Sequence, residues 1–271
     1  MARLHKLRRP GYGEKLSAPW RFVWLVLYYP VSALFRLTYR NIERIPQQGP
    51  MIIVTNHVSH IDPFLVAKFI LDAARTPRFL AKESIFEVPV VGWAMRSMGH
   101  IAVKRGTVDA RQSLAAAVAA LESGKAIVLH PEGTVTRDPE GWPMIGKTGA
   151  ARLAMLAPDV PVIPVAQWGV QAQFDFYRKK VKPFPRARHV ISVGEPVDLS
   201  AYRGRQPTAK VLHDVTDTIM RRLRCDVAQL RGVEAPTGDL YYWVRQSEKT
   251  QSDQMPGAEQ TPGTDTPGSA A

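Results

Sequence analysis

His57 and Asp62, five residues apart, are the pair in this sequence best suited to acid–base chemistry. An aspartate that orients an imidazole fixes its tautomer and stabilises the imidazolium formed when the histidine removes a proton. Such a pair can activate a substrate hydroxyl without a nucleophilic serine or cysteine of the protein. Asp62-Pro63 before an apolar run also predicts a helix start with Asp62 as N-cap, so the spacing leaves both roles open.

A metal site is the alternative for this segment, because His57, His60 and Asp62 cluster within six residues. Hydrolytic metal sites usually need further ligands elsewhere, and the remaining histidines show no paired spacing. The single cysteine, Cys225, excludes an internal disulfide framework and Cys-rich metal sites. We therefore expect neither a metal nor a bound cofactor.

Two further loops carry groups that suit an anionic ligand. Lys104 and Arg105 end an apolar strand, where the arginine fork fits a phosphate bidentately. A later strand leads into the segment His130–Arg137, in which an acid, a glycine and hydroxyls share a turn. Glu132 would be a costly charge to bury there unless paired, and Arg105 is the candidate partner. Lys147 precedes a helix whose free N–H groups favour an anion.

The elements around these loops alternate between short apolar runs and helical patterns. The expected strands are Met51–Val54, Arg78–Ala81, His100–Lys104, Ala126–Leu129, Val162–Ala166 and His189–Val193. The expected helices are Pro63–Ala74, Val91–Met98, Val108–Ser123, Gly146–Leu156 and Thr208–Leu230. This alternation predicts an α/β fold with a mostly parallel or mixed central sheet flanked by helices. Ligands of such sheets bind beyond the carboxyl ends of the strands, where the loops above lie.

The N-terminal region, residues 1–45, combines positive charge with an apolar run. Residues 1–21 carry six basic side chains and one acid, and Phe22–Phe35 is apolar except for Ser32. A membrane-crossing helix needs about 20 apolar residues, which is more than this run provides. Pro30 favours two short helical pieces over one rod. The aromatic and basic flanks predict an interfacial helical anchor in one leaflet, with a helix that covers the core as the alternative.

The net charge of +12 predicts attraction to a polyanion such as anionic lipid or nucleic acid. One basic cluster has aromatic residues interleaved with it, a pattern that could stack bases. Its members are Arg178, Lys179, Lys180, Lys182, Arg186 and Arg188, with Phe174, Phe176, Tyr177 and Phe184 among them. A solvated face against anionic headgroups is the favoured interpretation. Residues 246–271 hold too few large apolar groups to fold and are predicted to be disordered.

Four segments taken together resemble the motifs of the glycerolipid acyltransferase family. The first, Asn-His-x-Ser-x-x-Asp, is matched by Asn56, His57, Ser59 and Asp62. The second, a glycine, an apolar strand and an arginine, is matched by Gly99, Ile101, Val103 and Arg105. The third, Phe-Pro-Glu-Gly-Thr-Arg-Ser, corresponds to His130–Thr136, with Val135 at the arginine position and Arg137 two residues later. The fourth, Val-Pro-x-x-Pro, is matched by Val160, Pro161 and Pro164.

The resemblance implies an enzyme that acylates the free hydroxyl of 1-acylglycerol 3-phosphate, forming phosphatidic acid in phospholipid biosynthesis. The co-substrate would be an acyl thioester of coenzyme A or acyl carrier protein. His57 would be the general base and Asp62 its orienting partner. The implied substrate-binding residues are Asn56, Ser59, Lys104, Arg105, Glu132, Gly133, Thr134, Arg137 and Lys147. Val135 keeps other acceptors open: glycerol 3-phosphate, another lysophospholipid or a glycolipid.

The same resemblance sets the expected organisation and partners. Residues 1–45 would form the membrane-anchor region, 46–235 the acyltransferase domain and 246–271 the disordered tail. We expect a peripheral or monotopic protein on the cytoplasmic face of the cell membrane. Its partners would be membrane phospholipids and the acyl carrier, not nucleic acid.

Overall fold

The computed structural model describes residues 18–103, 109–175, 177 and 180–243, of which those up to Tyr241 belong to one compact unit. Within them, seven strands form a central sheet in the order β1-β9-β6-β2-β5-β3-β4. Neighbouring strands are parallel except for the antiparallel pair β6 and β9. The prediction of a mixed α/β sheet flanked by helices is confirmed.

The sheet strands are β1 (Arg36–Arg40), β2 (Met51–Thr55), β3 (Pro77–Lys82), β4 (Ile101–Val103), β5 (Ala126–Leu129), β6 (Val162–Trp168) and β9 (Arg188–Val193). The short strands β7 (Phe174–Asp175) and β8 (Lys180–Val181) pair as a separate hairpin. The helices are α1 (Ala18–Leu34), α2 (Asp62–Asp72), α3 (Glu83–Phe86), α4 (Pro89–Ser97), α5 (Asp109–Glu122), α6 (Gly149–Leu156) and α7 (Ala209–Arg231).

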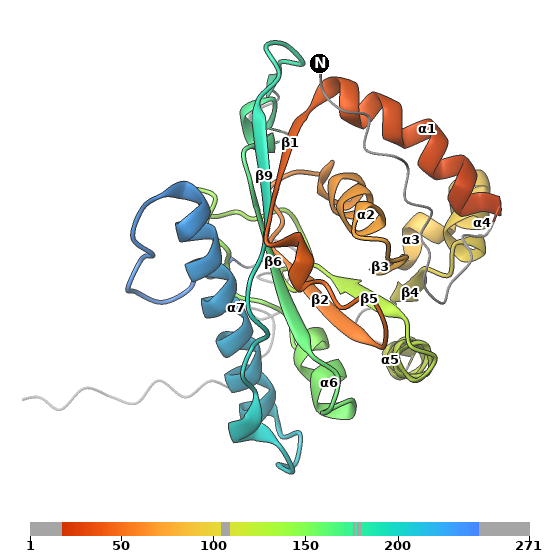
Figure 1. Cartoon of the computed structure of the whole chain (residues 1–271). Coiled ribbons are helices and arrows are strands. Elements are labelled where there is room, and N and C mark those ends of the chain that lie inside the picture. The colour runs from red at the N-terminus through yellow and green to blue at the C-terminus, as the bar shows by residue number, and fades with distance from the viewer. Residues whose placement is uncertain (1–17, 104–108, 176, 178–179, 244–271) are drawn as a thin grey trace, which may run out of the picture. The chain divides into compact units, whose positions relative to one another are not determined.

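The sheet separates two apolar cores. Helices α1 and α2 cover one face, and α5, α6 and α7 cover the other (Figure 1). All five residues of β2 are buried, which is typical of a parallel strand covered on both faces. Because β2 lies between β5 and β6, the loops that follow these three strands meet at one edge of the sheet.

All six predicted strands are present, but the sequence pattern does not predict β1. Arg36–Arg40 reads Arg-Leu-Thr-Tyr-Arg and carries only a weak apolar signal. The segment falls in the region predicted to be a membrane anchor, yet it pairs in parallel with β9 at the sheet edge. The folded domain therefore begins before residue 46.

Helix α1 corrects a second expectation. It runs unbroken from Ala18 to Leu34 with Pro30 inside it, not as two pieces. Trp20 near one end and Val31 near the other are both buried, so packing at both ends holds the helix across the proline. No helix that the structure describes has the length and apolar character needed to span a bilayer.

Candidate active site

The His57–Asp62 pair predicted from the sequence is formed. His57 Nδ1 lies 3.0 Å from Asp62 Oδ2, and the Asp62 side chain has no exposed surface. The same carboxylate oxygen accepts the backbone N–H groups of Val58 at 2.6 Å and Ser59 at 2.8 Å. A carboxylate oxygen in this setting is an acceptor, so Nδ1 carries the imidazole proton and Nε2 keeps its lone pair. This is the tautomer that a general base requires.

The structure also shows which of the two roles left open for Asp62 it takes. Helix α2 begins at Asp62 itself, its N-cap residue is Ile61, and no side chain caps it. The N-cap prediction for Asp62 is therefore wrong. Its carboxylate turns back to the preceding loop because that loop presents three N–H donors to a single oxygen.

Asn56 and Ser59, which the sequence assigns to substrate binding, hold the loop that carries His57 in place. Asn56 is fully buried, where its Nδ2 donates to the carbonyl of Gln167 and its Oδ1 accepts the Gln167 N–H. Ser59 Oγ donates to the carbonyl of Phe174 at 3.1 Å. These bonds tie the end of β2 to β6 and to the β7–β8 hairpin, so both residues act on the site by holding its loop.

Glu132 reaches the same loop from the segment after β5. Its Oε1 accepts the His57 N–H at 2.8 Å and its Oε2 accepts the Met144 N–H at 3.2 Å. Burial raises the pKa of this carboxyl to about 8, although the two backbone hydrogen bonds oppose the shift. Gly133, at φ +70°, adopts the left-handed conformation of the tight turn that follows Glu132. Arg105, its expected partner, lies outside the described residues.

His130 is the member of this site that the sequence analysis did not single out. Its ring centre lies 4.4 Å from that of His57 and stacks at 6.3 Å on Phe79. Burial, followed by the neighbouring His57, holds the pKa of His130 well below its usual range. His130 is therefore a neutral ring packed beside the base. Its signal was its place in the third motif, where the family pattern has an aromatic residue.

The predicted anion-binding residues divide into two groups. Lys104 and Arg105 lie outside the described residues. Arg137 and Lys147 are exposed, and each is linked to the catalytic-site segments through the backbone. Thr136, next to Arg137, donates its N–H to the His57 carbonyl. The Lys147 N–H donates to the carbonyl of Pro131, which belongs to the third motif. Thr134 and Gly133 are half-buried in the same turn. These backbone contacts hold Thr136, next to Arg137, against the His57 loop and the backbone of Lys147 against Pro131.

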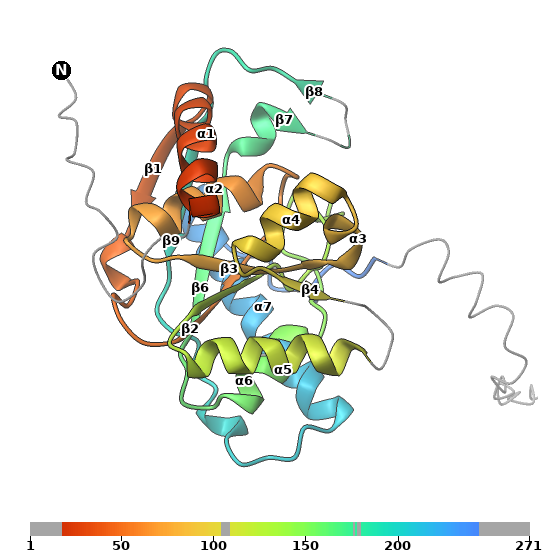
Figure 2. The same ribbon diagram turned by 90° about the vertical axis from the view of Figure 1, so that its right-hand side faces the viewer.

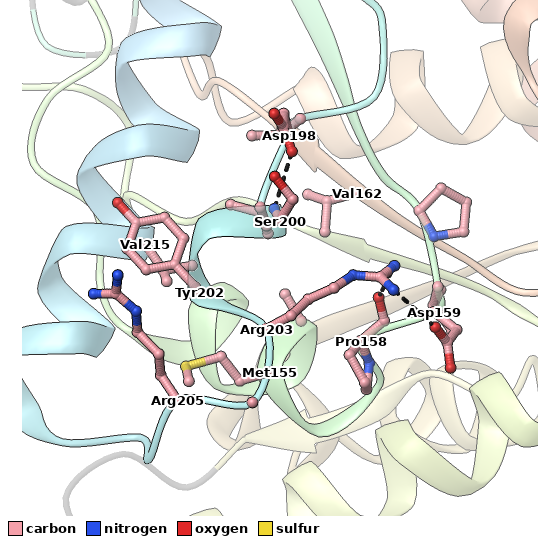
Figure 3. A pocket seen from close by; sticks show the side chains of 16 residues that line it. Met155, Pro158, Asp159, Val162, Asp198, Ser200, Tyr202, Arg203, Arg205 and Val215 are labelled. Carbon is pink, nitrogen blue, oxygen red and sulfur yellow. Dashed lines mark hydrogen bonds and ion pairs between the residues drawn. The ribbon is translucent and has the colours of Figure 1, made fainter.

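The described side chains show no group of three histidine, cysteine, aspartate or glutamate residues arranged to hold a metal. The ring centres of His57 and His60 are 6.2 Å apart. A cavity of about 540 Å³ lies elsewhere, beside the amino end of β6 (Figure 3). It is lined by Val162, Tyr202 and Arg203 among others, and Arg203 already pairs with Asp159. His57 follows the carboxyl end of β2, so this cavity is separate from the candidate active site.

Comparison with known proteins identifies relatives for this arrangement. A family model of acyltransferases matches residues 36–168, which run from the start of β1 to the end of β6. A chloroplast 1-acyl-sn-glycerol-3-phosphate acyltransferase of Brassica napus is 30% identical over 143 residues, 51% of this chain and 39% of that protein. The protein of the same name from Borreliella burgdorferi is 32% identical over 135 residues, 49% of this chain and 51% of that one. The chain therefore spans about half or less of the length of these relatives.

Two longer matches extend over most of the chain. An uncharacterised acyltransferase of Schizosaccharomyces pombe is 27% identical over 227 residues, covering 80% of this chain and 74% of that protein. The crystal structure of the 1-acyl-sn-glycerophosphate (LPA) acyltransferase of Thermotoga maritima matches with a TM-score of 0.59 and 23% identity. That match covers 80% of this chain and 81% of the other. At this level of identity the structural likeness shows a shared fold.

Proposed function

We propose that this chain, a member of the acyltransferase family, transfers an acyl group from an acyl thioester to 1-acylglycerol 3-phosphate. The product would be phosphatidic acid. The observation that carries the proposal is the 3.0 Å contact between His57 Nδ1 and the fully buried Asp62. That contact leaves Nε2 as a base beside a loop that presents cations, and both features suit an acceptor with a hydroxyl and a phosphate.

The chemistry needs one base and an activated donor. His57 Nε2 takes the proton of the acceptor hydroxyl while the hydroxyl oxygen attacks the thioester carbonyl. The new C–O bond forms, the C–S bond breaks, and the proton on His57 passes to the leaving thiolate. Asp62 stabilises the imidazolium between these steps. A positioned general base of this kind contributes roughly 10²–10⁴ in rate.

The acyl donor is proposed to be a thioester of coenzyme A or of acyl carrier protein. A thioester is already activated, so the protein has to align it with the hydroxyl and needs no covalent intermediate of its own. The only cysteine, Cys225, is exposed on α7 and has no part in this scheme.

The acceptor phosphate is proposed to bind cations that follow the strand ends. Arg137 and Lys147 are the candidates on the described part of the chain, and the family resemblance adds Lys104 and Arg105. Glu132, Gly133 and Thr134 shape the loop that supplies Arg137. Arginine is favoured for the phosphate because its fork can donate two parallel hydrogen bonds.

A position at the cytoplasmic face of the cell membrane, peripheral or monotopic, would bring the enzyme to its lipid substrate and product. Support comes from α1, where Phe22, Leu25, Val26 and Tyr29 are exposed. Apolar side chains on one face of a helix, with positive charge nearby, are typical of interfacial helices.

A different acceptor is the alternative to this proposal. Val135 stands where the third motif has arginine, and its side chain is buried, so one expected cation is missing. Glycerol 3-phosphate, another lysophospholipid or a glycolipid are therefore included in the test.

The test is an assay of the purified full chain with each donor and each acceptor in turn, with lipid products identified by mass spectrometry. We expect phosphatidic acid from 1-acylglycerol 3-phosphate, formed faster than the product of any other acceptor. Acyl transfer to a different acceptor alone would retain the reaction class and overturn the acceptor. No transfer to any acceptor, in protein whose folding is verified by circular dichroism, would overturn the proposed function.

A further inference from the structure

Arg137 and Tyr177, 40 residues apart in the chain, are stacked against each other. The guanidinium carbon of Arg137 lies 3.9 Å from the centre of the Tyr177 ring. Tyr177 Oη also donates to the carbonyl of Val135 at 3.1 Å. Tyr177 therefore contacts both the arginine and the backbone two residues before it. The hydrogen bond holds the Tyr177 ring beside the Val135 backbone, and contact with that ring restricts the exposed Arg137 side chain to a small set of positions.

Tyr177 comes from the connection between β7 and β8, the hairpin at the top of Figure 2. This hairpin is itself held close to the catalytic loop. Ser59 Oγ donates to the carbonyl of Phe174 in β7, and Gln173, just before β7, donates to the carbonyls of Leu34 and Pro183. The ring of Tyr177 thus stands on a segment anchored to the loop of His57 on one side and to the end of α1 on the other.

Arg137 is tied to the catalytic loop by its neighbour. The Thr136 N–H donates to the His57 carbonyl at 2.7 Å. Arg137 is therefore the next residue after one that is bonded to the His57 loop. Electrostatics agree with this placement. The pKa of His60 is lowered, first by burial, then by His57, and also by the charge of Arg137, while Asp62 opposes the shift. The charge of Arg137 is therefore close enough to His60 to disfavour the protonated form of that imidazole.

The placement of Arg137 matters because the third motif lacks its usual arginine in this chain. Val135 occupies the arginine position of the motif, and its apolar side chain is 3% exposed, so it offers nothing to an anion. The cation that this loop does supply is Arg137, two residues later. An arginine side chain carries five N–H donors in a fork that fits a phosphate, so Arg137 is the candidate for the cation that Val135 does not supply.

We propose that Tyr177 is a positioning residue that holds the Arg137 guanidinium for the acceptor phosphate, in place of the arginine that Val135 replaces. The inference rests on the proposed function, because it assigns the phosphate of the same acceptor. Tyr177 contributes through Arg137, whereas Arg137 touches the substrate. Loss of the ring should therefore weaken the acceptor in the same way as loss of the arginine, but less.

The experiment measures KM for acceptor and donor separately in wild type, four single variants and one double variant. Arg137→Ala removes the cation, and Tyr177→Leu removes the ring. Tyr177→Phe keeps the ring and loses the hydrogen bond to Val135. Arg205→Ala is the matched control, since Arg205 lies over the Tyr202 ring beside the distant cavity.

We expect Arg137→Ala to raise the acceptor KM at least tenfold and Tyr177→Leu at least threefold, with the donor KM within twofold of wild type. Tyr177→Phe should stay nearer to wild type than Tyr177→Leu, and Arg205→Ala should equal wild type. The double variant Arg137→Ala/Tyr177→Leu should match Arg137→Ala alone, because the ring acts only through the arginine. A ring with a merely structural role would lower kcat or stability without this selectivity.

Discrimination against monoacylglycerol, which lacks the phosphate, gives a second readout. The ratio of kcat/KM for 1-acylglycerol 3-phosphate over monoacylglycerol should fall at least tenfold in Arg137→Ala and partly in Tyr177→Leu. Wild-type activity that forms phosphatidic acid, together with an unchanged acceptor KM in both variants or with fully additive effects, would overturn this inference alone. A wild-type protein that forms no phosphatidic acid would contradict the proposed function and, with it, this inference.

Discussion

His57 Nδ1 and the backbone N–H groups of Val58 and Ser59 all donate to the same oxygen, Oδ2 of Asp62. The aspartate therefore organises the backbone of the loop and the imidazole at once. The two backbone hydrogen bonds hold the carboxylate in place, and the third bond orients the His57 ring against it. The His57–Asp62 pair and the fold of its loop form one structural unit, so variants at Asp62 have to be judged on both activity and stability.

His57→Ala should lower acyl transfer by roughly 10²–10⁴ because the proton acceptor is removed. The thermal midpoint should change little, since the His57 side chain is partly exposed and Asp62 keeps two backbone donors. The measurement is single-turnover transfer together with thermal unfolding. Retention of a tenth of wild-type turnover would refute the general-base role.

Asp62→Asn separates charge from geometry. An amide oxygen in place of Oδ2 can accept the same three N–H groups, so the loop should keep its shape. The variant lacks the negative charge that stabilises the imidazolium, so the rate should fall by roughly 10²–10⁴. Its amide nitrogen replaces Oδ1, which is buried without a partner, so some loss of stability is expected as well. Wild-type turnover in a folded Asp62→Asn protein would show that the charge is unimportant.

The buried carboxyl of Glu132 should make stability depend on pH. Its pKa is raised from 4.5 to about 8 in the folded chain, mainly by burial, so between these values the folded state holds a proton that the unfolded state releases. This contribution is complete below about pH 4.5 and is lost as pH rises through about 8. Between these two pH values the free energy of unfolding should fall by at most about 1.4 kcal/mol per pH unit.

Glu132→Gln removes this titration and provides the comparison. The amide oxygen can accept only one of the two N–H groups that the carboxyl binds, so the variant should be less stable at low pH. The difference in unfolding free energy between wild type and variant should shrink as pH rises from 5 to 8. Urea unfolding at several pH values measures it, and parallel stability curves for the two proteins would contradict the raised pKa.

Asn56→Ala tests whether this buried amide is structural. The change leaves the N–H and C=O of Gln167 unpaired in the interior, and each such group costs about 1–3 kcal/mol. We expect a lower free energy of unfolding and, with the loop of His57 released, lower activity. Gln206→Ala, at an exposed position, should change stability by less than about 0.5 kcal/mol. A fully stable but inactive Asn56→Ala protein would instead return Asn56 to a role in substrate binding.

Membrane attachment through α1 should depend on its exposed apolar face. Replacing Phe22, Leu25 and Tyr29 together by serine should reduce co-sedimentation with anionic vesicles, whereas Leu156→Ser, at an exposed leucine of α6, should not. Salt should weaken wild-type binding only in part, because a Debye length of about 8 Å screens charges but not apolar burial. Unchanged binding of the triple variant would move the attachment to another surface. Deleting residues 1–40 would be a poorer test, because it removes β1 from the sheet.

Local patterns were sufficient for most of the framework. The buried strands β2 and β5 are short continuous apolar runs, and α7 repeats apolar residues at helical spacing behind an N-cap at Thr208, whose side chain accepts the Val211 N–H. These signals are read within a few residues because burial on a strand or on one face of a helix imposes a fixed period. The spacing of His57 and Asp62 likewise lies within one loop, and the structure brings them together as predicted.

The sequence by itself therefore determined the α/β class, six of the sheet strands and the contact between His57 and Asp62. Only the tertiary structure decided the pairing of β1 with β9, the hydrogen bond of Glu132 to the His57 backbone and the stacking of Tyr177 on Arg137. The physical reason is the same in each case. These contacts join segments far apart in the chain, so they depend on how the sheet orders its strands, and no local period encodes that order.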